Sequence, residues 1–246
     1  MRDLDKYQAD YALHEFEQHQ VRYRKRHTIE CLRRYCPHQV LEVGCGLSPL
    51  FVDYAEFETM DVVEPSNVFF EFARVAAAGD QRIRLHAGTL EQHAQALSAR
   101  PYDFILLSGL LHEVEFPDAL LACVRELCSQ DTVVHVNVPN AKSLHRLLAL
   151  EMGLIETLDE LSATQRRLQQ HRTFDLTSLV SLICRAGFAV RQSGSFFVKP
   201  FTHSQMAHLQ STGLLTDQML DGLYGLTAYL PEYGSEIFAT FAVRPA

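Results

Sequence analysis

Short apolar runs, rich in β-branched residues, alternate with longer segments of helical periodicity in the first 140 residues of this 246-residue chain. The helical periodicity is clearest at 68–78 and at 117–128, where Pro117 suits the first turn of a helix. Strands that alternate with helices in this way are typical of a parallel sheet covered by helices. The five predicted strands span 40–43, 59–63, 83–85, 104–107 and 132–138. The sequence therefore predicts an α/β fold.

The second part of the chain departs from this alternation. Residues 141–172 are predicted to be mostly helical, with Gly153 as the only break, and a second helical insertion spans 204–230. The other predicted elements are a helical N-terminal segment, a helix at 175–186 and strands at 188–191 and 237–243. Long helical insertions between strands indicate caps over one edge of the sheet.

The composition argues against several classes of protein. The formal charge of −8 disfavours a nucleic-acid partner, and the basic run at 22–27 is typical of a solvated helix face. The six cysteines include no C-x-x-C pair and no histidine at zinc-ligand spacing, so we expect no metal and a reducing, cytoplasmic location. The first residues are charged and no run approaches eighteen apolar residues, which predicts neither a signal peptide nor a membrane partner.

A glycine-containing turn follows the first predicted strand, where residues 42–49 read Glu-Val-Gly-Cys-Gly-Leu-Ser-Pro. Glycines at a strand-to-helix turn let the backbone bend sharply and approach a ligand closely, although a structural turn without a ligand is the alternative. The dinucleotide fingerprint G-x-G-x-x-G fails, because Pro49 stands where the last glycine is required. The turn therefore points away from a nicotinamide enzyme.

An acidic residue ends the second predicted strand, twenty-two positions after Glu42. A carboxylate in this place can accept hydrogen bonds from both hydroxyls of a ribose, as in dinucleotide folds. We expect Glu64 to bind a ribose, against the alternative of an exposed carboxylate at a strand end. The turn and the acid are independent indications of one nucleoside site.

This succession resembles the class I S-adenosylmethionine-dependent methyltransferases, which open with [D/E]-x-G-x-G, over nearly the whole chain. The resemblance implies S-adenosylmethionine as cofactor and a Rossmann-like, seven-stranded sheet, mostly parallel with an antiparallel last strand. It also implies a single domain over 1–246, with a helical N-terminal segment and helical cap insertions. Within that domain the lid, the cofactor-binding core and the two caps would be 1–36, 37–140, and 141–174 with 201–235.

The resemblance also implies which residues bind the cofactor. Glu42 would orient its amino group, while Ser48 stands where the family often has a third glycine. Thr89 would recognise the adenine, although it could equally cap the next helix. Tyr11 would close over the cofactor, although aromatic residues at such spacing more often pack a helix onto the body. The expected cofactor contacts are Glu42, Gly44, Cys45, Gly46, Glu64, Pro65, Thr89, Leu90, Ser108 and Tyr11.

The end of the fourth strand bears on the chemistry, because ligands of open α/β sheets bind at the carboxyl edge. The [D/N/S]-P-P-[Y/F/W] motif of enzymes that methylate base amines is missing here. Residues 110–113 instead resemble the L-H-[D/E] stretch of small-molecule O-methyltransferases, whose histidine deprotonates a hydroxyl. We expect His112 to be this base, with capping of the next helix or shaping of the pocket as alternatives.

Residues 138–146 and the later His-Arg pair resemble stand-alone bacterial methyltransferases of natural-product or surface-sugar pathways. The function expected is methyl transfer to a small molecule, with a hydroxyl oxygen favoured over an amine as the acceptor atom. The alternatives are N-methylation, a catalytically silent binding subunit and a nucleotide-dependent oxidoreductase. The chain would act as a monomer or a homodimer. The expected acceptor contacts are Asn137, Asn140, His145, His171, Arg172 and Lys199.

Overall fold

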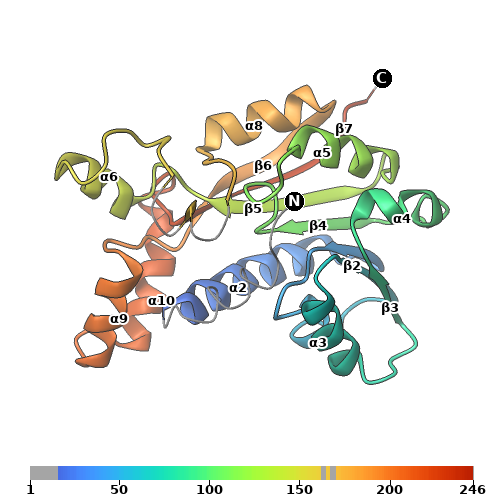
Figure 1. Cartoon of the computed structure of the whole chain (residues 1–246), viewed down its shortest axis with the longest axis horizontal. Helices are drawn as coiled ribbons and strands as arrows, with labels where there is room; N and C mark the ends of the chain where they lie inside the picture. Colours follow the sequence, from blue (N-terminus) through green and yellow to red (C-terminus); the bar gives the residue numbers. More distant parts are fainter. Residues whose placement is uncertain (1–15, 162–164, 167–169, 246) are drawn as a thin grey trace.

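One seven-stranded sheet forms the centre of the computed structural model, which describes residues 16–161, 165–166 and 170–245 (Figure 1). The strand order is β3-β2-β1-β4-β5-β7-β6. Strands β1 to β5 pair in parallel, and β7 runs antiparallel to both of its neighbours. The strands are β1 (Gln39–Val43), β2 (Thr59–Glu64), β3 (Ile83–Ala87), β4 (Phe104–Ser108), β5 (Val133–Pro139), β6 (Phe188–Phe196) and β7 (Glu236–Val243). The predicted mostly parallel sheet with an antiparallel last strand is confirmed.

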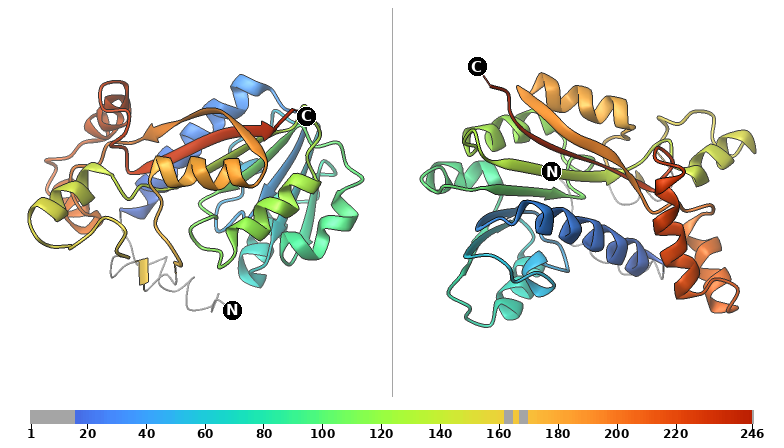
Figure 2. Two further views of the ribbon diagram at one scale, coloured as in Figure 1. Left: turned by 90° about the horizontal axis from the view of Figure 1, so that it is seen from above. Right: turned by 180° about the vertical axis from the view of Figure 1, so that it is seen from behind.

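Helices cover both faces of this sheet, with α4, α5 and α8 on one face and α2 and α3 on the other (Figures 1 and 2). The elements α6, α9 and α10 lie beyond the sheet, at the edge toward which β5 runs. The helices are α2 (Glu17–Tyr35), η1 (Leu50–Val52), α3 (Asn67–Ala77), α4 (Leu90–Leu97), α5 (Pro117–Glu126), α6 (Leu144–Glu151), α8 (Leu176–Arg185), α9 (His203–Ser211), α10 (Asp217–Gly225) and η2 (Leu226–Ala228).

The two cores follow from the period of two along each strand, which sends successive side chains to opposite faces. Leu41 and Val43 of β1 pack with α4, α5 and α8, whereas Val40 packs with α2 and α3. A third cluster, which includes Tyr23 of α2 and Phe196 of β6, joins α2 to α9 and α10. The N-terminal helix is thus part of the body along the described part of its length.

Three local predictions need correction. The strand predicted at 188–191 continues to Phe196, because β6 pairs with β7 on both sides of an irregularity at Arg191, although its middle residues are polar and exposed. The segment at 141–172 is helical only at 144–151 and 165–166 among its described residues. No side chain of α6 is fully buried, so little packing extends the helix. A single 3₁₀ turn, η1, follows the glycine turn after Pro49 in place of a longer helix.

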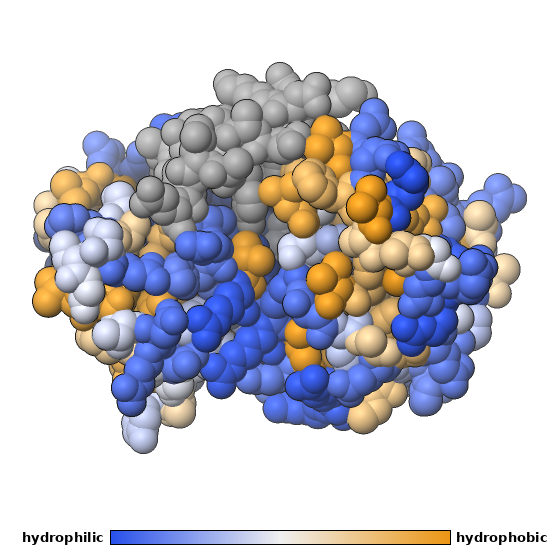
Figure 3. All heavy atoms as spheres, turned by 90° about the horizontal axis from the view of Figure 1, so that it is seen from below, coloured by the Kyte–Doolittle hydropathy of each residue, from blue (hydrophilic) through white to orange (hydrophobic). Residues whose placement is uncertain are grey.

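The sheet topology brings one end of each of the seven strands to a common edge. The parallel strands β1 to β5 end there, and the pairing of Glu236 with Pro139 and Phe196 brings the start of β7 and the end of β6 to the same edge. Figure 3 shows the molecule from below, where hydrophilic residues lie between two apolar patches, one over the α9–α10 pair and one over α3. No helix in the described ranges is long and apolar enough to cross a membrane.

Candidate functional site

A cavity of about 670 Å³ opens at this common edge. Its first half, which we call the nucleoside half, is lined from the ends of β1, β2 and β4 and includes Glu42, Gly46, Glu64 and Ser108. Its second half, the acceptor half, is lined from α2, α6, α9 and the adjoining ends of β5, β6 and β7. The sheet order separates the two halves, since β5, β7 and β6 all lie beyond β4.

The glycine turn forms the floor of the nucleoside half. Gly44 and Gly46 have φ values of 78° and 57°, which side chains with a Cβ rarely adopt. A Cβ on Gly46 would meet nothing within 4 Å, so backbone conformation rather than crowding requires glycine there. A Cβ on Gly44 would touch the Leu110 side chain at 3.5 Å. The turn therefore presents bare backbone to the cavity.

Glu42 is buried beneath this turn. Its carboxylate accepts hydrogen bonds from the backbone N–H of Leu50, at 3.0 and 3.2 Å to its two oxygens, and so holds the start of η1. Burial raises the pKa of Glu42 to about 7, with the nearby carboxylate of Glu64 acting in the same direction. A cationic ligand would favour the ionised form of both acids.

Glu64 ends β2 and binds the turn from the side. One carboxylate oxygen accepts from the Ser66 backbone N–H at 2.8 Å, and the other accepts from the Gly46 N–H at 3.1 Å. The Cys45 thiol also donates to this second oxygen, over 3.6 Å, and burial among the acids raises the thiol pKa. Burial raises the pKa of Glu64 as well. The carboxylate is therefore fixed in orientation before any ligand arrives.

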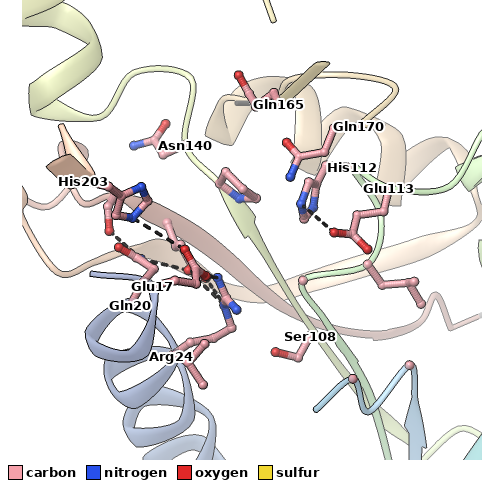
Figure 4. A pocket seen from close by; sticks show the side chains of 18 of the residues that line it. Glu17, Gln20, Arg24, Ser108, His112, Glu113, Asn140, Gln165, Gln170 and His203 are labelled. Atoms are coloured by element: carbon pink, nitrogen blue, oxygen red, sulfur yellow. Dashed lines mark hydrogen bonds and ion pairs between the residues drawn. The ribbon is translucent and has the colours of Figure 1, made fainter. Parts of the chain in front are cut away.

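The end of β4 lies between the two halves. Ser108 donates its hydroxyl to the side-chain oxygen of Asn137, which also accepts from the Gly109 N–H, both at 3.1 Å. His112 lines the cavity, is buried, and places its Nε2 3.7 Å from a carboxylate oxygen of Glu113 (Figure 4). The imidazole is thus next to an acid that can stabilise its protonated form.

A network of polar side chains from α2 and β7 forms the wall of the acceptor half (Figure 4). Arg24 donates from Nε and Nη2 to the carboxylate of Glu236, at 2.6 to 2.9 Å, and Gln20 donates to the same carboxylate at 2.9 Å. Glu17 lies 3.6 Å from both Arg24 and His203. The spacing of 17, 20, 24 and 28 along α2 indicates one helix face, a signal that the sequence analysis did not use.

Lys199 and His145 complete the acceptor half. The Lys199 side chain is 2% exposed, and burial lowers its pKa to about 8 against the opposing influence of Glu17 and Glu236. The pKa of His145 lies well below its usual range because of burial and the charge of Lys199. Both residues were predicted as acceptor contacts, and both line the cavity.

Five other predicted site residues lie outside the cavity lining. Asn137 supports the end of β4, Thr89 and Leu90 begin α4, and Leu90 is in the core. The Arg172 side chain donates to the Glu115 carbonyl oxygen at 3.0 Å, and the backbone N–H of His171 donates to the carbonyl oxygen of His112. In these positions the residues support the segments around the cavity and do not line the cavity itself. The residues concerned are Thr89, Leu90, Asn137, His171 and Arg172.

Two further predictions have different outcomes. Asn140 lines the cavity, yet its amide donates to the carbonyl oxygens of Glu232 and Gly234 at 2.9 and 2.8 Å. The Asn140 amide therefore fixes the backbone segment at 232–234, which leads into β7. Tyr11 lies outside the described residues. Pro65, Cys45 and Gly44 line the nucleoside half beside Glu64, as expected for cofactor contacts.

The fold and the nucleoside half define a Rossmann-like domain that binds a nucleoside cofactor at the carboxyl edge of its sheet. A family model described as a methyltransferase domain matches residues 17–193. The chain belongs to this family, and its fold is that of the class I S-adenosylmethionine-dependent methyltransferases, with S-adenosylmethionine as cofactor. A search of curated protein sequences found no match.

Solved structures with the same fold are distant in sequence. A crystal structure of an S-adenosylmethionine-dependent methyltransferase from Mesorhizobium loti is 15% identical and has a TM-score of 0.54, over 86% of this chain and 95% of that one. A methyltransferase from Thermotoga maritima, described as a possible histamine N-methyltransferase, is 16% identical, with a TM-score of 0.56 over 99% and 97%. At these identities the likeness shows the fold alone.

A third structure, phosphoethanolamine N-methyltransferase 2 of Haemonchus contortus with bound S-adenosyl-L-methionine, is 14% identical with a TM-score of 0.58. The match covers 89% of this chain and 53% of that one, so the present chain spans about half of that longer protein. The residues of the nucleoside half fit such a cofactor. Bare backbone lies at the glycine turn, and two buried carboxylates suit a ligand that carries positive charge and ribose hydroxyls.

Proposed function

We propose that this protein transfers the methyl group of S-adenosylmethionine to a hydroxyl oxygen of a small molecule held in the acceptor half. The observation that carries the proposal is the position of His112, which lines the cavity at the end of β4, between the two halves. Bound S-adenosylmethionine supplies an electrophilic methyl group. An acceptor hydroxyl needs a base, because the neutral oxygen is a weak nucleophile.

The residues of the nucleoside half hold and orient the cofactor. The Glu64 carboxylate would accept hydrogen bonds from the ribose hydroxyls, and the bare backbone at Gly44 to Gly46 would hold the methionine portion. Glu42, in its ionised form, adds attraction for the positive charge. In this scheme the protein contributes mainly by positioning, since a well-oriented pair of reactants gains up to ~7–11 kcal/mol over the reaction in solution.

His112 would take the proton of the acceptor hydroxyl as the new bond to carbon forms. The nearby Glu113 carboxylate would stabilise the imidazolium that results. The cavity volume of about 670 Å³ is in the range of small-molecule sites, which favours a small acceptor over a macromolecular one. Because His112 is buried, water has little access to compete for its lone pair.

Substitution of His112 by Gln tests the proposal directly. We expect turnover of a hydroxyl acceptor, found by screening for release of S-adenosylhomocysteine, to fall by about 10²–10⁴-fold. The affinity for S-adenosylhomocysteine should stay within about twofold, as measured by calorimetry. His38→Gln, a change of an exposed histidine that is remote from the cavity, is the control and should leave turnover intact. An undiminished rate in His112→Gln would remove this residue as the base.

A further inference from the structure

Lys199 is a buried cation at the inner wall of the acceptor half. Its ammonium forms no hydrogen bond or ion pair with any of the described residues, although its side chain is 2% exposed. The two acids that influence it, Glu17 and Glu236, are already engaged by Arg24 and other partners. A buried charge without a close partner destabilises the folded protein.

The backbone before Lys199 is bent in a way that directs the chain into the cavity. Phe197 has a φ of 58°, a strained left-handed conformation that is rare for bulky side chains. Its ring is fully buried and stacks on Tyr23 at 4.5 Å, and its carbonyl oxygen accepts from the Ser235 N–H at 2.8 Å. The strained residue is therefore held by packing and a hydrogen bond, and the cavity-lining Lys199 follows it by two positions.

Other groups at this wall also suit an anion. His145 of α6 lines the same half, its Nδ1 has no hydrogen-bond partner among the described residues, and the charge of Lys199 acts on it. His203 of α9 adds a second imidazole to the lining. On protonation, either ring would add positive charge beside the ammonium. The titratable groups facing Lys199 are thus Glu17, Glu236, His145 and His203.

We propose that Lys199 binds an anionic group of the methyl acceptor, a carboxylate or a phosphate, and so selects acidic acceptors. This inference rests on the proposed function for its second substrate. Strand β6 lies three positions from β4 in the sheet, roughly 14 Å at about 4.8 Å per strand. The acidic group would therefore lie at one end of an elongated acceptor, with the reacting hydroxyl at His112.

The test uses the full chain and measures thermal unfolding with three probes at matched ionic strength. The probes are inorganic phosphate, 4-hydroxybenzoate and its uncharged analogue 4-hydroxybenzamide. We expect at least one of the two anions to raise the unfolding temperature of the unaltered protein, and the amide to leave it unchanged. Phosphate and hydroxybenzoate distinguish between the two acidic groups.

Lys199→Met removes the charge while keeping the length and apolar stem of the side chain. We expect the ligand-free variant to unfold at the same or a higher temperature, because an unpaired buried ammonium has been removed, and to lose the stabilisation by the anion. Lys142→Met, which removes a half-exposed lysine paired with Asp175, should keep the anion effect. As a second measurement, stabilisation of the unaltered protein should weaken as the pH rises through about 8, where Lys199 loses its proton.

Three results would overturn the proposal: no anion binding by the unaltered protein, equal binding by Lys199→Met, or an effect of the amide as large as that of the anion. Calorimetry with S-adenosylhomocysteine separates this proposal from the first. Lys199→Met should bind S-adenosylhomocysteine as the unaltered protein does, whereas weakened binding would assign Lys199 to the cofactor. Failure of the unaltered protein to bind it would instead contradict the methyl-transfer function, while the anion result would stand independently.

Discussion

The two halves of the cavity are built in different ways. In the nucleoside half, the contacts join residues close in sequence, such as Gly46 with Glu64 and Leu50 with Glu42. In the acceptor half, Arg24 binds Glu236, more than two hundred residues away. The nucleoside half uses backbone groups and two glutamates, whereas the acceptor half combines glutamates with the cationic side chains of Arg24 and Lys199. A fixed cofactor can be held by local geometry, while the wall of the acceptor half forms only where distant parts of the chain meet.

The largest effect should follow from loss of the acid in the nucleoside half. Glu64→Ala would remove the acceptors proposed for two ribose hydroxyls, and bonds to a charged group contribute about 1.5–3 kcal/mol each, so S-adenosylhomocysteine should bind about 10²–10⁴-fold more weakly. Calorimetry measures the change. Glu71→Ala, at an exposed acid on α3, is the matched control. Affinities within threefold for Glu64→Ala and the unaltered protein would show that this half does not hold the ribose.

A smaller effect should appear where α2 packs against strands β6 and β7, next to the acceptor half of the cavity. His27 stacks on Phe196 at 4.4 Å between ring centroids and packs at a tilt against Phe238 at 4.2 Å, and burial lowers its pKa to about 4. The folded protein therefore excludes the charged form, so its stability is full above pH 6.5 and falls as the pH drops from 6.5 toward 4. Between pH 7 and 5 the loss from His27 alone should be on the order of 2 kcal/mol.

Denaturant unfolding at several pH values measures this loss. His27→Phe keeps a ring in the stack without the titrating group, so its stability should fall less over the same range. The exposed His38 provides the control, since His38→Gln should reproduce the unaltered profile. If His27→Phe lost as much stability as the unaltered protein, the acid sensitivity would lie elsewhere, with the buried His135 as the next candidate.

The smallest predicted effect concerns Glu42 and tests the electrostatic difference between the two halves of the cavity. Its pKa of about 7 means that it gains a proton as the pH falls below neutrality. Binding of the positively charged cofactor should then weaken, by up to about tenfold per pH unit below pH 7. Calorimetry with S-adenosylmethionine at pH 7.5 and pH 6 measures the change in affinity, and Glu42→Gln should reduce this pH dependence. An unchanged slope in the variant would assign the pH dependence to another group.

The positions of the parallel strands and the residues of the glycine turn and its acid could be predicted from the sequence because both depend on local patterns. Alternating apolar runs gave each strand of the parallel part, and the spacing from Glu42 to Glu64 indicated the ribose position. The glycine turn was expected to begin a helix, whereas Pro49 leads only into the 3₁₀ turn η1. Even here, Thr89 begins α4 away from the cavity lining.

The acceptor half could be predicted only in part, because its contacts depend on tertiary structure. Lys199 and His145 line the cavity as expected, yet the network around Glu236 forms only when α2 packs against the start of β7. The cap at 141–172 has a helical pattern, but Arg146 donates to the carbonyl oxygens of Leu158 and Glu160 and so stabilises a loop. No local pattern in the sequence indicates such a side chain-to-backbone contact.

The most direct test of the division into two halves is a crystal structure of the full chain with S-adenosylhomocysteine. We expect the ribose hydroxyls to lie against the Glu64 carboxylate and the homocysteine portion against Gly44 to Gly46, with the wall at Lys199 left uncovered. Density for the ligand across Lys199 and Glu236, with Glu64 uncontacted, would contradict this expectation.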